Sequence, residues 1–177
     1  GGAKTAAISL LPVGASPVVT VAGGTTVADP LVKTSLVLSA NFVTGAANVV
    51  VDLTGLDPSS FQALAFPGST VARNLLNAAG HLRPIGLADL HVSDGLGTEY
   101  ALANSAQLEL AIPIAFQGLS ELSPGSLVQC FRFDDASGTW LAFATGLVGT
   151  SSVYTAQPVV TVGVNRGGWY ASGLFDG

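Results

Sequence analysis

The chain has 177 residues, which is enough for one or two domains with a buried core. Only 10% of its residues are charged and 49% are hydrophobic, yet no apolar run reaches the ~18 residues of a membrane span. Its six basic residues are spread thinly within a net charge of −5, which excludes the basic patch that a nucleic acid requires.

Short segments with alternating apolar residues and many β-branched residues recur from end to end. Glycine, proline, asparagine and aspartate separate them, as in antiparallel sheets joined by tight turns. We therefore predict an all-β fold, an antiparallel β-sandwich of the immunoglobulin-like or a related type. The predicted strands cover residues 5–13, 16–22, 33–43, 47–56, 82–93, 98–103, 106–116, 125–134, 138–146, 151–156, 158–164 and 167–175.

One segment, residues 69–80, has the features of a short helix. Ser69 can cap its N-terminus, apolar residues follow at helical spacing, and Gly80 can end it. A loop is the alternative for this segment. The fold is expected to contain at most this one helix.

The whole chain, 1–177, is expected to form a single β-rich unit. The stretch around Pro67 is less regular than the rest, so a division into sub-sandwiches of 1–66 and 82–177 is the alternative. Residue 1 is not methionine, so we expect Gly1 and Gly2 to be left by processing or cloning, with any signal peptide removed. Cys130 is the sole cysteine, and strand-rich chains with almost no cysteine are common among secreted bacterial proteins. The expected location is therefore outside a bacterial cell or on its surface.

Metal-ligating residues are few. His81, His91 and Cys130 lack the spacing of a zinc site. Asp94, Asp134 and Asp135 could offer oxygen ligands, but the spacing of a calcium loop is absent. We therefore predict no metal, and we interpret residues 134–138 as a hairpin turn in which the aspartates accept backbone hydrogen bonds.

The motifs of common enzymes are also missing. The sequence contains no G-x-S-x-G elbow and no glycine loop with phosphate-binding spacing. Glu99 and Glu109 could form a carboxylate pair for glycoside hydrolysis, but the sequence does not place them face to face. The expected protein is not an enzyme and needs no cofactor.

Two self-processing reactions are alternatives. Residues 91–93 contain His91 and Ser93 in a His-x-Ser pattern, in which a serine hydroxyl attacks the strained peptide bond before it. Lys4 on the first strand and Asn165 near the last could form an amide cross-link promoted by Glu109. For this second pair, a solvated Lys4 and a turn Asn165 are the preferred interpretation.

A carbohydrate-binding module is a further alternative. Trp140, Trp169 and Tyr170 lie in the last 40 residues with Tyr154, and sugar-binding sandwiches stack rings on exposed aromatic residues. In a chain with only 7% aromatic residues, tryptophans on strands usually belong to the core.

The C-terminal half contains a series of short motifs in a fixed order: Ile112-Pro113-Ile114, Pro124-Gly125, Phe133-Asp134, Gly138-Thr139-Trp140 and Gly168-Trp169-Tyr170. With these motifs, about residues 84–172 resemble an extracellular β-domain region of cartilage intermediate layer protein and of many bacterial surface proteins, whereas residues 1–80 have no counterpart in it. The resemblance implies scaffolding or adhesion rather than a reaction, although a related sandwich in ankyrins and netrin receptors includes members that cleave themselves at His-x-Ser.

The sequence therefore predicts a non-enzymatic structural or adhesion module. Self-assembly is expected because few charges protect the surface and its sheet edges. Residues 1–22 carry no charge after Lys4, so we expect them to pair either within their own sandwich or with a neighbouring copy. The expected partners are other copies or other surface components, without nucleic acid and without a membrane span.

Overall fold

The computed structural model of the chain describes residues 14–60, 66–103 and 106–177. Within these ranges the protein is all-β and its strands form one large, mostly antiparallel sheet with a sandwich-like arrangement, which confirms the predicted fold class. The strands are β1 Val18–Thr20, β2 Thr25–Asp29, β3 Thr34–Leu38, β4 Asn48–Leu56, β5 Val71–Arg73, β6 Ala79–Ser93, β7 Ala106–Ala111, β8 Leu127–Asp134, β9 Thr139–Thr150, β10 Pro158–Val164 and β11 Gly168–Asp176. Two single-turn 3₁₀ helices, η2 Ile114–Phe116 and η3 Ser120–Leu122, lie between β7 and β8.

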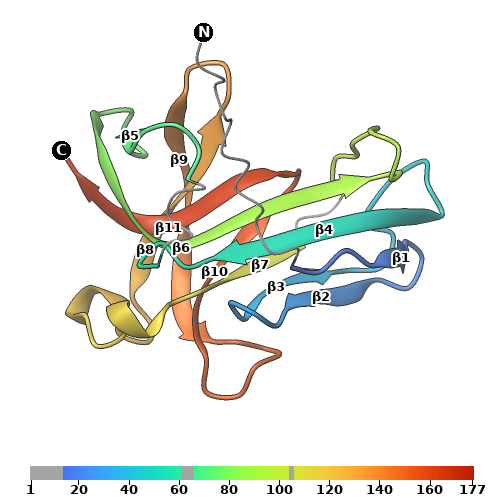
Figure 1. Ribbon diagram of the computed structural model, residues 1–177, viewed down its shortest axis with the longest axis horizontal. Helices are drawn as coiled ribbons and strands as arrows, with labels where there is room; N and C mark the ends of the chain where they lie inside the picture. The colour runs from blue at the N-terminus through green and yellow to red at the C-terminus, as the bar shows by residue number, and fades with distance from the viewer. Residues whose placement is uncertain (1–13, 61–65, 104–105) are drawn as a thin grey trace, which may run out of the picture.

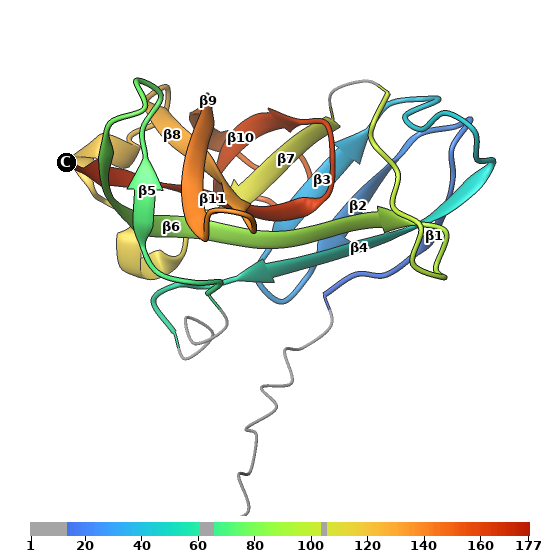
Figure 2. The same ribbon diagram turned by 90° about the horizontal axis from the view of Figure 1, so that it is seen from above.

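The sheet is a continuous path that folds over on itself. Its order is β1-β4-β6-β11-β8-β9-β10-β7-β3-β2. Figure 2 shows β4 and β6 together in one layer and β2, β3 and β7 in the other (Figures 1 and 2). Strand β9 connects the layers because its first part pairs with β8 and its last part with β10.

The main core lies between these two layers. Leu53 and Leu90 from one layer and Leu36 and Leu108 from the other are fully buried in a single hydrophobic cluster. Strand β4 pairs with β6, and β3 pairs with β7. Strands from residues 1–66 and from 82–177 therefore contribute to the same sheet and the same core.

The end of the sandwich that carries the C-terminus is closed by β5. This strand pairs antiparallel with β6 and parallel with β9. Because β6, β11, β8 and β9 are already neighbours, β5 completes a ring of strands. Trp140 lies inside the ring and is fully buried, with its ring centroid 4.9 Å from Phe66 and 5.3 Å from Phe133. These side chains form a second hydrophobic cluster.

The helix predicted over 69–80 is wrong. This segment forms β5, a turn and the start of β6, and Val71 pairs with His81. The Asn74 side chain accepts the backbone N–H groups of Leu76 and Ala78, so it fixes a turn that competes with a helix. Leu75 and Leu76, which would lie on the buried face of that helix, are exposed.

Several other strand predictions differ from the structure. Residues 98–103 form only an isolated bridge between Ser93 and Glu99, and 151–156 form a turn in which Ser151 Oγ accepts two backbone N–H groups. Strand β2 was missed because its Thr-Thr-Val-Ala-Asp sequence is short and weakly apolar. The strand predicted over 5–13 lies outside the described residues.

We predict that Trp140→Ala lowers the free energy of unfolding by about 3–5 kcal/mol, because it leaves a large cavity inside the closed ring. Trp140→Phe is the matched control: it keeps an aromatic ring beside Phe66 and should cost clearly less. Urea denaturation of the three proteins measures both values. A loss below about 1 kcal/mol for Trp140→Ala would show that the ring can collapse around the cavity.

Candidate functional site

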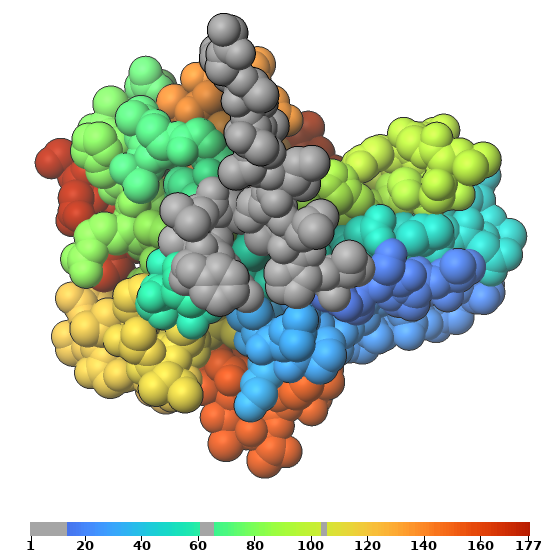
Figure 3. Space-filling model, viewed as in Figure 1, coloured from blue at the N-terminus to red at the C-terminus, as the bar shows by residue number. Residues whose placement is uncertain are grey.

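The two ends of the sheet path meet at one side of the molecule. Strands β1 and β2 are consecutive in the chain, yet β1 pairs with β4 and β2 pairs with β3, and neither has another strand neighbour in the described ranges. A groove of about 320 Å³ lies between them, lined by residues 17–20 and 23–27. Figure 3 shows β1 and β2 in blue at the surface, at the right-hand end of the molecule. We call this feature the β1–β2 groove.

Among the described residues, the backbone of β1 and its flanks forms strand hydrogen bonds on one side only. Ala15 and Pro17 bond with Leu53 and Val51 of β4, and Val21 bonds with Ala47 just before β4. Antiparallel pairing alternates along a strand, so the N–H and C=O groups of Ser16, Val18 and Thr20 point away from β4, toward the groove side. These are the groups with which an edge strand accepts a further strand.

The described residues that line the groove beside this edge carry no charge. Val18 is 73% exposed and Thr20 is also exposed, whereas Val19 and Val21 face the core. Pro17 is a residue type that often protects an edge, but its nitrogen lies on the β4 side, opposite Val51. As far as the described ranges extend, the free edge of β1 is therefore uncharged and unpaired.

Strand β2 forms the other wall of the groove. Thr25 and Thr26 are exposed and Val27 is buried. The one acid of this strand, Asp29, is buried and accepts the backbone N–H groups of Leu31 at 2.9 Å and Gly55 at 2.8 Å. Its charge is directed into the protein and does not guard the groove.

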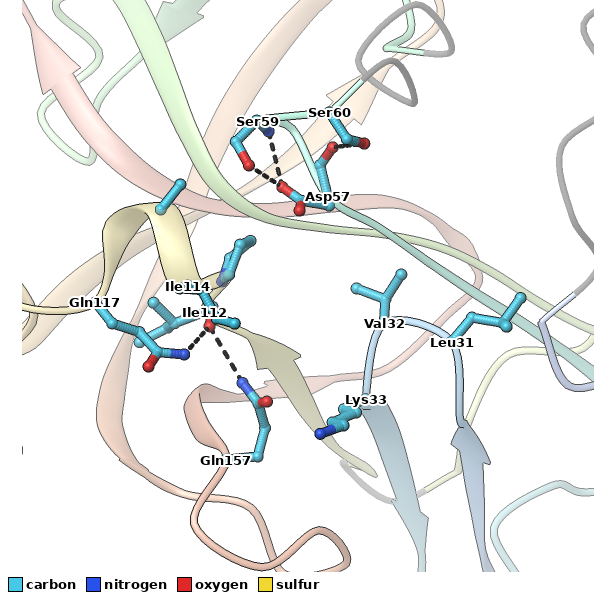
Figure 4. Close-up of a pocket in the computed structure, with 12 residues that line it drawn as sticks. Leu31, Val32, Lys33, Asp57, Ser59, Ser60, Ile112, Ile114, Gln117 and Gln157 are labelled. Atoms are coloured by element: carbon cyan, nitrogen blue, oxygen red, sulfur yellow. Dashed lines mark hydrogen bonds between the residues drawn. The ribbon is translucent and has the colours of Figure 1, made fainter.

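A larger hollow lies elsewhere, where three connections meet Gln157 (Figure 4). Its volume is about 530 Å³. The side chains of Gln117 and Gln157 both donate to the carbonyl of Ile112, at 3.0 and 3.1 Å, so the two amides are held in place. Figure 4 shows the Lys33 ammonium directed toward Gln157, and Asp57 on the opposite wall.

The predicted self-cleavage residues lie within β6. His91 pairs with Asp52 and Ser93 pairs with Val50 in the ladder to β4. His91 Nδ1 lies 2.5 Å from Glu99 Oε1, and Nε2 lies 3.1 Å from Asp89 Oδ1. Both ring nitrogens therefore face carboxylates.

Ser93 lies two residues beyond His91, and its hydroxyl oxygen accepts the N–H of Gly95 at 3.1 Å. The structure therefore engages both residues in other contacts, and self-cleavage stays a prediction.

Electrostatics around His91 favour its charged form. Burial opposes protonation, but the hydrogen bond that His91 donates to Glu99 and the charge of Asp89 outweigh it and raise the pKa of His91 above its usual value. Burial also raises the pKa of Asp89. The pairing of His91 with Glu99 ties the turn after β6 to the sheet, and sequence reasoning missed it.

The structure does not place Glu109 beside Asn165. Lys4 lies outside the described residues, so the cross-link stays a prediction. Glu109 is buried opposite Thr161 of β10, whereas Asn165 lies four residues further along, about 13 Å away at strand spacing. Glu109 instead accepts hydrogen bonds from Ser35 Oγ at 3.1 Å and from the N–H of Ser152 at 2.9 Å.

Two of the three aromatic residues proposed for sugar stacking are buried. Trp140 is fully buried and Tyr170 is 2% exposed, so neither ring has a face available to a ligand. Burial raises the pKa of Tyr170 to about 12, and its hydroxyl donates to the carbonyl of Arg166 at 2.5 Å. Trp169 is half-buried and lies across from Asp89.

The predicted hairpin at residues 134–138 is confirmed. Asp134 ends β8 and accepts hydrogen bonds from the Oγ and N–H of Ser137, which lower its pKa. Gly138 adopts a φ of 66°, as the turn requires. Asp134 is thus a turn residue, next to the exposed Asp135.

Metal-binding chemistry finds no support in the described ranges, where no group of three or more histidine, cysteine or acidic residues could hold an ion. Cys130 is buried, and burial raises the pKa of its thiol to about 12, so it stays protonated.

Comparison with known proteins finds no matching family model, curated protein or solved structure. The helices of the described ranges are all too short or too polar to cross a membrane. The resemblance of residues 84–172 to extracellular β-domains stays a prediction.

We predict that His91 contributes stability at acidic pH and loses it at alkaline pH. A raised folded-state pKa gives stabilisation that is complete below the unfolded value of 6.5 and disappears as the pH rises through the folded value. The difference in free energy of unfolding between wild type and His91→Gln should therefore be larger at about pH 5.5 than at about pH 8.5. This difference should stay below about 1 kcal/mol, because the pair of His91 and Glu99 is partly exposed.

The measurement is urea denaturation across this pH range. His81→Gln is the matched control, because His81 is an exposed histidine without a carboxylate partner in the described ranges. A difference for His91→Gln that does not change with pH would contradict the ion-pair assignment.

Proposed function

We propose that this chain is a non-enzymatic structural module of a bacterial secreted or cell-surface protein, and that it assembles with copies of itself through the free edge of β1. One observation supports the proposal above all others. The strand path ends in two uncharged edges that border an open groove. Unprotected edges are the surfaces through which β-proteins add strands from other chains.

The composition supports the same conclusion. With 10% charged residues, the surface has little electrostatic repulsion against self-association. The groups that could do chemistry are engaged in structure: both nitrogens of His91 face carboxylates, and the thiol of Cys130 is buried. These contacts favour a scaffold over a catalyst.

The test is the assembly state of Val18→Pro. The N–H of Val18 points away from β4, so proline at this position removes a docking group without breaking a hydrogen bond of the native sheet. We expect light scattering to give a multiple of the 17.7 kDa chain mass for wild type and a single chain for the variant.

Val18→Thr is the matched control, because it keeps the N–H and the β-branched shape and should assemble like wild type. Circular dichroism verifies that both variants keep their sheet. If wild type is monomeric at high concentration, the proposed self-assembly fails.

The polar pocket of Figure 4 favours a second candidate, a carbohydrate-binding module. Gln117 and Gln157 have their N–H groups fixed on the Ile112 carbonyl, so their oxygens are oriented acceptors for hydroxyl groups. Lys33 supplies a donor from the opposite side. The volume of about 530 Å³ falls in the range of small-molecule sites.

Lys33→Gly tests this candidate without endangering the fold. Lys33 has a φ of 66°, a left-handed conformation that glycine adopts more easily, so the variant should fold at least as well. If maltose, lactose or cellobiose shifts amide signals of the pocket in NMR spectra, we expect Lys33→Gly to weaken that binding about tenfold or more. Unchanged spectra with all three sugars would count against this candidate.

A further inference from the structure

We propose that the strand which fills the β1–β2 groove is residues 7–11 of a second copy of the chain. This inference rests on the proposed self-assembly and names its donor segment. It predicts a head-to-tail contact, in which the N-terminal segment of one copy lies between β1 and β2 of the next. Such a contact produces rings or open chains rather than a symmetric pair of edges.

The groove borders the free edge of β1. Its volume is about 320 Å³, and residues 17–20 and 23–27 line it. A paired strand lies about 4.8 Å from its neighbour, so a donor strand would occupy the space directly beside β1 on this side.

The free edge also sets the length of the donor. Ser16, Val18 and Thr20 direct their backbone groups toward the groove side, and these positions span five residues. An antiparallel or parallel partner of about five residues satisfies them. Val19 and Val27 line the groove and are both buried.

The N-terminal segment has the sequence that this site requires. Residues 5–13 read Thr-Ala-Ala-Ile-Ser-Leu-Leu-Pro-Val and contain no charge. Ile8 and Leu10 alternate with the smaller Ala7 and Ser9, so both would point to the same face if the segment were an extended strand, and both could then enter the groove. Pro12 lacks an N–H, and Lys4 carries a charge, so these two residues limit the strand on either side.

Entry of residues 7–11 into the groove of their own copy is hindered by the contacts of Gly14 and Ala15. Ala15 exchanges two hydrogen bonds with Leu53, and Gly14 is packed so closely on the Leu53 carbonyl that no Cβ would fit. To enter its own groove, the chain would have to reverse direction directly at this tightly packed point. A second copy meets no such restriction.

The experiment mixes two variants of the full-length chain that are each expected to be monomeric. Val18→Pro blocks the acceptor edge and keeps the donor segment. Ile8→Asp with Leu10→Asp blocks the donor segment and keeps the edge. We expect light scattering to show single chains for each variant alone, and a mass of two chains for the equimolar mixture, because one intact donor meets one intact acceptor.

Ala7→Asp with Ser9→Asp is the matched control, since it adds the same charges to the opposite face of the strand. This variant should still assemble. If Ile8→Asp with Leu10→Asp assembles like wild type while Val18→Pro does not, the donor inference is overturned and edge-to-edge assembly through β1 survives. If the aspartates at 8 and 10 instead unfold a wild-type monomer, the segment belongs to its own core and the inference is overturned as well.

Discussion

The rest of the structure depends on one constraint: β1 and β2 follow each other in the chain but lie in different layers of the sandwich. The strand path starts at one and ends at the other, and the two do not pair with each other, so the sheet stays open between them. Within the described residues every other strand has at least two neighbours, and these two have one each. The open side of the molecule is therefore a consequence of strand order, and the proposed assembly surface follows from it.

At the opposite end of the sandwich, a ring of strands replaces the free edges. There β5 pairs with both β6 and β9, and the ring it completes is filled by Trp140 and its aromatic neighbours. Closure removes the free edges, and the large buried side chains make it favourable. The molecule thus has a closed end and an end with two free edges, and the association that we propose involves the second of these, at β1 and β2 (Figure 1).

The sequence predicted the class of fold because alternation of apolar residues is a local signal, which is plain in β4 and β10. It failed where local signals compete: Asn74 turns the chain inside a segment with helical spacing, and β2 carries too few apolar residues. The candidate site was harder to predict, because the groove depends on which strands become neighbours. The contact between His91 and Glu99 likewise depends on a turn that brings residues eight positions apart together.

Pro17 shows why an edge cannot be judged from residue types alone. Judged by residue type alone, Pro17 would protect the N-terminal strand, as proline does on many sheet edges. In the sheet, hydrogen bonds alternate between the two sides of a strand, and the register with β4 places the Pro17 nitrogen on the paired side. The missing N–H therefore weakens the contact with Val51 and leaves the outer edge intact. A shift of the register by one residue would place the same proline on the free edge and close it, so the register with β4 decides whether this surface can accept a strand.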